Sequence, residues 1–238
     1  MDSTCAKYVC IIILNNMFRI DHIVFGALSL EEGTQFIEKK LDTKLSNIGY
    51  HDFMGTHNRV LKIGKNIYFE VIAIDPNSKI LNHDRWFNLD NKKLKKKLKK
   101  KPQIIGYVID TLDQKILKHY SPFFKAVRGN YKWNFAMPKL ENDKLYPGLI
   151  ESGVMPSLIN WQSEKPINKM QDSKFELENI EIEIMEKQCS YKTFLMSLGQ
   201  SDKINYLVNK NDKKDLSGNY PKLKISIKDT LKNKVIYL

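Results

Sequence analysis

One histidine near the start of the chain interrupts an apolar segment. Side chains alternate across a strand, so His22 is expected to share its face with Ile20, Val24 and Gly26. An unpaired buried polar group costs about 1–3 kcal/mol, so an imidazole in that row needs a partner. That partner could be a metal ion or a backbone carbonyl.

Glu70 interrupts a second apolar segment. Its expected neighbours on the same strand face are Tyr68, Ile72 and Ile74. Desolvation strongly penalises a lone buried carboxylate, which is normally paired or bound to metal. Glu70 is therefore a candidate metal ligand, and the alternative is an ion pair with Arg59 on the neighbouring strand.

Three further polar residues occupy the strand before Glu70. His57 and Asn58 are adjacent, so at most one of them points into a cavity. His57 could act as a general acid–base group or a further ligand, or it could be a histidine satisfied within a hairpin. Asn58 is a candidate for hydrogen bonding to a substrate. Arg59 could clamp a substrate carboxylate.

The segments that carry these residues are predicted to form a strand, a helix and then antiparallel strands. Residues 20–26 are apolar on both faces, which is typical of a buried strand. Ser29-Leu-Glu-Glu32 is a capping box and predicts a helix to about Leu41. A hairpin with a turn at residues 64–66 follows. The remaining strands of this βαβββ unit are expected at residues 45–49, 56–63 and 67–74.

The same order of elements recurs along the chain. Helices are predicted at residues 113–127 and 189–198. Strands are predicted at residues 104–111, 131–137, 155–161, 175–184, 204–208, 222–227 and 235–238. The pattern thus indicates two to three βαβββ units.

A lysine-rich helix is predicted over residues 91–101, with Asp90 as its cap and Pro102 after its end. Leu94 and Leu98 are four residues apart and anchor it, which favours a solvated surface helix over a membrane or nucleic-acid patch. The net charge is +12, but only four of the 39 basic residues are arginines. Arginine forks favour phosphate and base recognition, so no specific nucleic-acid partner is expected.

The composition limits the fold of the chain and the compartment expected for it. The 238 residues, 42% of them hydrophobic, are enough for a substantial core. Cys5, Cys10 and Cys189 are odd in number and scattered, which argues against a disulfide framework and favours the cytoplasm. The apolar run at residues 9–14 is far shorter than the ~20 residues of a membrane helix, so no membrane role is expected. Residues 1–16 are interpreted as an extension outside the fold.

The chain resembles the glyoxalase-like branch of the vicinal-oxygen-chelate superfamily, which includes glyoxalases, bleomycin-resistance proteins and dioxygenases. The matching phrases are Asp21-His-Ile-Val24, Gly55-Thr-His-Asn58, Tyr68-Phe-Glu-Val-Ile-Ala-Ile-Asp-Pro76, Arg85-Trp-Phe-Asn-Leu-Asp90 and Val154-Met-Pro-Ser-Leu-Ile-Asn-Trp161. The resemblance implies an α+β fold of repeated βαβββ modules, whose curled mixed sheets surround a cavity with the helices outside. The expected divisions are an extension at 1–16, modules at 17–90, 104–165 and 175–238, and the lysine-rich linker at 91–103.

In catalytic members of this superfamily a divalent metal lies in the cavity. The resemblance implies that His22 and Glu70 would bind Zn, Fe, Mn, Ni or Mg. The second module departs from the enzyme pattern, because Gly106, or Ile105 with a shifted gap, falls at one ligand position and Asn160 at the other. Asn160 is therefore assigned, with Asn58 and Arg59, to substrate binding.

Two functions fit this resemblance. The first is a metal-dependent lyase, isomerase or oxygenase that acts on a small oxygen-rich molecule, with His57 or a water molecule moving the proton. The second is a metal-free protein of the same fold that binds or sequesters a small molecule. Family members often pair modules between chains, so a homodimer is one arrangement, and three modules could also close the cavity within one chain.

Overall fold

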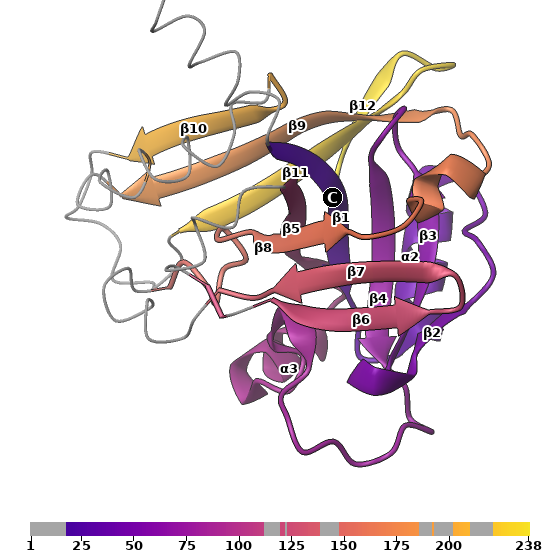
Figure 1. Cartoon of the computed structure of the whole chain (residues 1–238). Coiled ribbons are helices and arrows are strands. Elements are labelled where there is room, and N and C mark those ends of the chain that lie inside the picture. Colours follow the sequence, from indigo (N-terminus) through magenta and orange to yellow (C-terminus); the bar gives the residue numbers. More distant parts are fainter. Residues whose placement is uncertain are drawn as a thin grey trace, which may run out of the picture.

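A computed structural model describes residues 18–111, 120–121, 123–138, 148–185, 192, 202–209 and 221–238. Eight strands form one mixed sheet in the order β2-β3-β4-β1-β5-β8-β7-β6, and four form a second in the order β10-β9-β11-β12 (Figure 1). The larger sheet comprises β1 (Phe18–Gly26), β2 (Gly49–His51), β3 (Thr56–Lys62), β4 (Tyr68–Ile74), β5 (Gln103–Thr111), β6 (Phe124–Arg128), β7 (Tyr131–Ala136) and β8 (Ser157–Trp161).

The smaller sheet comprises β9 (Phe175–Met185), β10 (Ile204–Asn209), β11 (Lys222–Asp229) and β12 (Lys234–Tyr237). Within the described residues, two α-helices are seen along their length, α2 (Leu30–Leu41) and α3 (Lys92–Leu98). Three short 3₁₀ turns lie at Asp52–Met54, Trp86–Asn88 and Pro166–Lys169. No helix within the described ranges is long and apolar enough to cross a membrane.

The larger sheet curls until its two edge strands meet. Arg128 at the end of β6 donates from Nη1 to Nε2 of His51 on β2, across 2.9 Å, although these strands stand at opposite ends of the strand order. The sheet is therefore nearly closed into a barrel. The predicted α+β fold, with a curled mixed sheet around a cavity, is confirmed.

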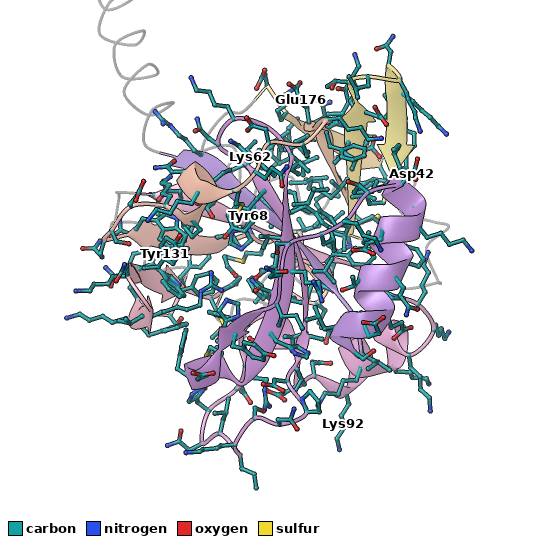
Figure 2. All side chains as sticks on the ribbon, turned by 90° about the vertical axis from the view of Figure 1, so that its right-hand side faces the viewer. Asp42, Lys62, Tyr68, Lys92, Tyr131 and Glu176 are labelled. Carbon is teal, nitrogen blue, oxygen red and sulfur yellow. The ribbon has the colours of Figure 1, made fainter. Side chains whose placement is uncertain are left out.

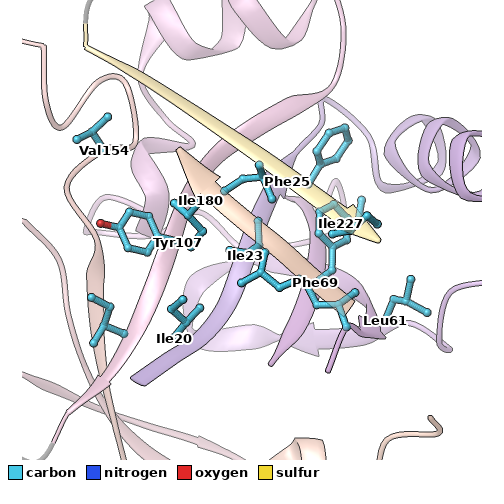
Figure 3. Close-up of a cluster of buried hydrophobic side chains, with 14 of the residues drawn as sticks. Ile20, Ile23, Phe25, Leu61, Phe69, Tyr107, Val154, Ile180 and Ile227 are labelled. Atoms are coloured by element: carbon cyan, nitrogen blue, oxygen red, sulfur yellow. The ribbon is translucent and has the colours of Figure 1, made fainter. Parts of the chain in front are cut away.

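The outer face of this sheet forms the main hydrophobic core. Ile23 and Phe69 from the larger sheet pack there with Ile180 and Ile227 from the smaller one (Figure 3). Burial of this apolar surface at about 25 cal/mol per Å² is the main force that holds the two sheets together. The larger sheet consequently presents only its inner face to the cavity.

Helix α2 covers another part of the outer face (Figure 2). Ser29 caps it as predicted, and its side chain accepts a hydrogen bond from the Glu32 amide at 3.2 Å. Ile37 and Leu41 are buried against the sheet. A Cβ on Gly33 would lie 2.7 Å from Val71, so this glycine allows the helix to pack closely on β4.

Two local predictions are wrong. The helix expected over residues 113–127 fails at its end, because Phe124–Arg128 form β6 and pair with β7 around a turn at Gly129, whose φ is +57°. Residues 112–119 lie outside the described residues, as does the helix expected at 189–198 apart from Lys192. The cap of α3 is Asn91 rather than Asp90, because Asp90 instead pairs with Arg85 at 2.9 Å.

Candidate functional site

A β-bulge in β1 sets the direction of two polar residues. Ile20 pairs with Ile109 and His22 pairs with Val108, so Asp21 is the extra residue between them. The bulge shifts the alternation, and Ile20 therefore packs in the outer core while His22 faces the cavity. The expectation that Ile20 shares the face of His22 is wrong for this reason.

Asp21 receives donors from three sides. Its carboxylate lies 2.7 Å from Nδ1 of His22, and its other oxygen accepts a hydrogen bond from Nε1 of Trp161 at 2.8 Å. The Tyr68 side chain also hydrogen bonds to it. Asp21 is only 3% exposed, and these donors compensate its burial. Because Asp21 is an acceptor, it holds the proton of His22 on Nδ1.

Tyr68 fixes the imidazole from one face. Its ring stacks on His22 with centroids 4.6 Å apart and planes inclined by 18°. Burial raises the pKa of the Tyr68 phenol well above its usual value, and the nearby charges of Asp21 and Glu70 raise it further. The phenol therefore stays protonated and acts as a donor.

Glu70 faces the other nitrogen of His22. Its Oε2 lies 3.6 Å from Nε2 of His22, and its Oε1 accepts a hydrogen bond from Nδ2 of Asn58 at 2.6 Å. All three side chains are buried, and each is 5% exposed or less. The strand register explains why these side chains meet. Glu70 pairs with Val24 of β1 on one side and with Val60 of β3 on the other.

His51 and Arg128 form a second polar pair at the cavity wall. Arginine has no acceptor, so Nε2 of His51 must be the unprotonated nitrogen that accepts from Arg128. The proton is then on Nδ1, which lies 3.2 Å from Oγ1 of Thr56. Burial, and next the charge of Arg128, lower the pKa of His51 well below its usual value.

The cavity is small and mainly apolar. Its volume is about 40 Å³. All three tryptophans of the chain line it. Tyr68, which is labelled in Figure 2, belongs to its wall and is buried. The polar and aromatic residues around it are His22, His51, Asn58, Tyr68, Glu70, Arg128, Trp86, Phe87, Trp133, Phe135 and Trp161.

The structure brings together three of the six residues singled out from the sequence: His22, Glu70 and Asn58. His57 lies on the opposite face of β3, where burial lowers its pKa. Its Nε2 is buried without a hydrogen-bond partner in the described part of the chain. Arg59 donates to the Ser46 carbonyl at 2.6 Å, and Glu70 is paired with Asn58 and not with Arg59.

Asn160 also stands outside the cavity. Its Nδ2 donates to the Thr111 carbonyl at 2.9 Å, while its neighbours Ile159 and Trp161 face inward. On β5, Gly106 stands opposite Val24, in the same row as Glu70. Within the described ranges, β5 to β8 add no carboxylate or imidazole to the cavity wall.

Sequence reasoning missed Asp21, His51, Tyr68 and Arg128 as site residues. Asp21 adjoins His22, and two polar residues in succession within an apolar strand are the available signal for a bulge. Arg128 is one of only four arginines and precedes the Gly129 turn. The contact between Arg128 and His51 joins residues 77 positions apart, and no local pattern indicates it.

The donor set does not fit a resident divalent metal. No group of three or more His, Cys, Asp or Glu side chains in the described residues could hold a metal ion. The available donors are Nε2 of His22 and the Glu70 carboxylate, whereas catalytic metal sites usually have three protein ligands. One Glu70 oxygen already accepts from Asn58, and the cationic Arg128 lines the same cavity.

Comparison with known proteins assigns this chain to a family. Residues 20–190 match the glyoxalase-like domain family. The chain belongs to that family. A search of the curated proteins finds no match. A hypothetical protein from Staphylococcus aureus has a similar structure, with a TM-score of 0.55 and 15% identity over 82% of this chain and 87% of that chain.

More distant matches include methylmalonyl-CoA epimerases. The Streptomyces coelicolor enzyme, in complex with 2-nitronate-propionyl-CoA, gives a TM-score of 0.43 and 16% identity over 63% of this chain and 99% of its own. The Mycobacterium tuberculosis enzyme gives 0.38 and 14% over 63% and 91%. The resemblance seen in the sequence is thus confirmed at the level of family and fold. A fold alone does not determine an activity.

Proposed function

We propose that the cavity binds a small oxygen-rich molecule and moves a proton on it, as a lyase or isomerase does. One observation carries this proposal: the free nitrogen of an oriented histidine lies 3.6 Å from a buried carboxylate inside a cavity with aromatic walls. General acid–base catalysis needs a positioned imidazole and a route for the proton, and this arrangement supplies both.

Each residue has a definite task in such a transfer. Asp21 holds Nδ1 of His22, so Nε2 is left to accept a proton from a C–H bond next to a carbonyl. The imidazolium that forms lies between Asp21 and Glu70, whose negative charges stabilise it. Glu70 can take the proton onward, and its hydrogen bond from Asn58 keeps it in place.

A divalent metal, which the family resemblance implies, has only His22 and Glu70 as donors here. The proposed transfer therefore uses this chain's own acid–base groups. We expect protein purified without chelators or metal-affinity resin to contain well under one equivalent of metal. A stoichiometric metal that is lost in Glu70→Ala would contradict this expectation and restore the metal-dependent interpretation.

The experiment that tests the proposal is hydrogen–deuterium exchange at carbon. Pyruvate and its neutral analogue pyruvamide carry a methyl group next to a carbonyl, and exchange of that methyl in D₂O is followed by proton NMR. We expect the protein to accelerate exchange of one or both above buffer. We also expect His22→Gln to remove most of the acceleration and Glu70→Gln to reduce it.

His57→Gln is the matched control, because it removes a histidine from the opposite face of β3. Its exchange rate should stay within about twofold of the wild-type rate, because residues away from a site usually have small effects. Exchange that is independent of His22, or no acceleration with either probe, would contradict the proposed function.

A second candidate is a metal-free binding or sequestering protein. It is favoured by the contribution of β8 to the cavity wall, where Ile159 and Trp161 stand in place of ligands. Binding of pyruvate in the cavity without exchange would support it. In either case the curled sheet closes through His51 and Arg128 within one chain, so no second copy is needed to form the cavity. The scattered cysteines support the cytoplasm as its place of action.

A further inference from the structure

Arg128 differs from the other arginines in its surroundings. Arg85 forms an ion pair with Asp90, Arg59 donates to a backbone carbonyl on the outer side of β3, and Arg19 is exposed. Arg128 lines the cavity. Among the residues that the structure describes, no carboxylate lies within 4.0 Å of its guanidinium.

The surroundings hold Arg128 in place without neutralising it. Its acceptor is His51, a neutral imidazole, and a hydrogen bond to a neutral group leaves the guanidinium charge uncompensated. His51 is fixed in turn by Thr56, whose hydroxyl also accepts from Nε1 of Trp86 at 3.1 Å. A Cβ on Gly49 would lie 2.9 Å from Nη1 of Arg128, so glycine leaves room for the arginine.

The anionic groups in the cavity wall and directly behind it already have donors. Asp21 is hydrogen bonded to His22, Trp161 and Tyr68, and Glu70 accepts from Asn58 beside His22. The guanidinium is therefore the one cation in the described cavity wall without an anion, and its five donors match a planar carboxylate in a fork.

We propose that Arg128 is the residue that selects a carboxylate-bearing ligand for this cavity. The inference rests on the proposed function, because it names the substrate class of the same site. The carboxylate accepts from the Arg128 fork at the β6 wall. The carbon beside the adjoining carbonyl then faces Nε2 of His22 at the β1 wall. A small 2-oxo acid, and not its amide or a cationic amine, fits this placement.

The test uses the tryptophan indole N–H resonances of the full-length protein. The chain has three tryptophans and all three line the cavity, so a ¹H–¹⁵N spectrum contains one reporter for each. Pyruvate and pyruvamide are titrated separately at low ionic strength. We expect pyruvate to shift these signals with at least tenfold higher affinity, because the two probes differ mainly in charge.

Three variants assign the difference to Arg128. Arg128→Gln should abolish the preference for pyruvate, and Arg128→Lys should keep part of it because the charge stays while the fork is lost. Arg59→Gln, on the outer side of β3, is the matched control and should keep the full preference. The comparison of the two probes on the wild-type protein needs no variant, so it stands even where a variant fails to fold.

Equal affinities for the two probes would overturn the proposal, as would a preference that persists in Arg128→Gln. Failure of pyruvate to shift any indole signal at about 100 mM, a concentration at which even a very weak ligand binds detectably, would also overturn it.

The outcomes also separate this inference from the proposed function. Exchange that depends on His22 but is equally fast for pyruvate and pyruvamide would leave the acid–base function in place and remove the role of Arg128. Tight and selective binding of pyruvate without exchange would do the reverse.

Discussion

The two halves of the eight-stranded sheet contribute different chemistry to one cavity. Strands β1 to β4 provide its carboxylate, Glu70, its imidazoles and the amide of Asn58, and the bulge in β1 places Asp21 beside His22. Strands β6 to β8 provide aliphatic and aromatic walls and one cation, Arg128. The comparison shows that a sheet can be built from similar halves while its acid–base groups are confined to one of them. The other half is then free to shape and select the ligand.

Two side-chain hydrogen bonds among the described residues join the halves, in addition to the backbone pairing of β1 with β5. Trp161 of β8 donates to Asp21 of β1, and Arg128 of β6 donates to His51 of β2. The first contact fixes the group that orients His22. The second closes the sheet. Each contact therefore links the binding half to the reacting half, and breaking them tests the comparison.

The largest effect is expected from Asp21→Ala. It leaves the buried donors of His22, Trp161 and Tyr68 without their common acceptor, so the free energy of unfolding should fall by about 3–5 kcal/mol. Urea denaturation measures the change. Asp110→Ala is the control on adjacent β5, where a partly exposed carboxylate pairs with Lys165, and it should cost about 1 kcal/mol or less. Equal losses in the two variants would refute the central position of Asp21.

Trp161→Phe breaks the same contact from the other half and should have a smaller effect. The ring is largely kept, but one oxygen of Asp21 loses its donor, which costs about 1–3 kcal/mol. Thermal denaturation compares it with Trp133→Phe, whose ring packs on Trp161 with centroids 5.5 Å apart. A greater loss in Trp133→Phe would show that packing, and not the hydrogen bond, joins the halves.

The contact between His51 and Arg128 should make stability depend on pH. The pKa of His51 is lowered in the folded state, so the unfolded chain binds the proton more readily and stability falls as the pH drops below about 6.5. Between pH 7.5 and 5.5, His51 alone should lower the free energy of unfolding by about 1.4 kcal/mol. Urea denaturation at the two pH values checks it. His51→Gln should lose this part of the dependence, and an unchanged dependence would contradict the assignment.

Gly49→Ala should have the smallest effect on stability and a clear one on binding. The new Cβ would lie 2.4 Å from Oδ1 of Asn58 and 2.9 Å from Nη1 of Arg128, and both are ends of side chains that can move aside. We expect a loss of about 1 kcal/mol or less, within the range of mild overpacking, together with weaker pyruvate binding in the indole titration. Gly106→Ala, which has room for a Cβ, is the control. Equal binding by the two variants would count against the placement of Arg128.

The sequence predicts those parts of the site that depend on alternation within a strand. His22 and Glu70 follow from polar residues in apolar rows, and α2 follows from the capping box that ends at Glu32. Alternation admits only one of His57 and Asn58 to the cavity and does not decide which. Asp21 could not be placed, because the bulge appears only in the pairing of β1 with β5. The role of Arg128 depends on the curling of the whole sheet, which brings β6 to β2.

The most direct test of the account is the protonation of the His22 side chain, read from its ¹⁵N chemical shifts by NMR at neutral pH. The account predicts a proton on Nδ1, bonded to Asp21, and a bare Nε2 that faces Glu70. It also predicts that Asp21→Asn disturbs this tautomer. A neutral imidazole with its proton on Nε2 in the wild-type protein would contradict it, because the nitrogen proposed to accept the proton would already carry one.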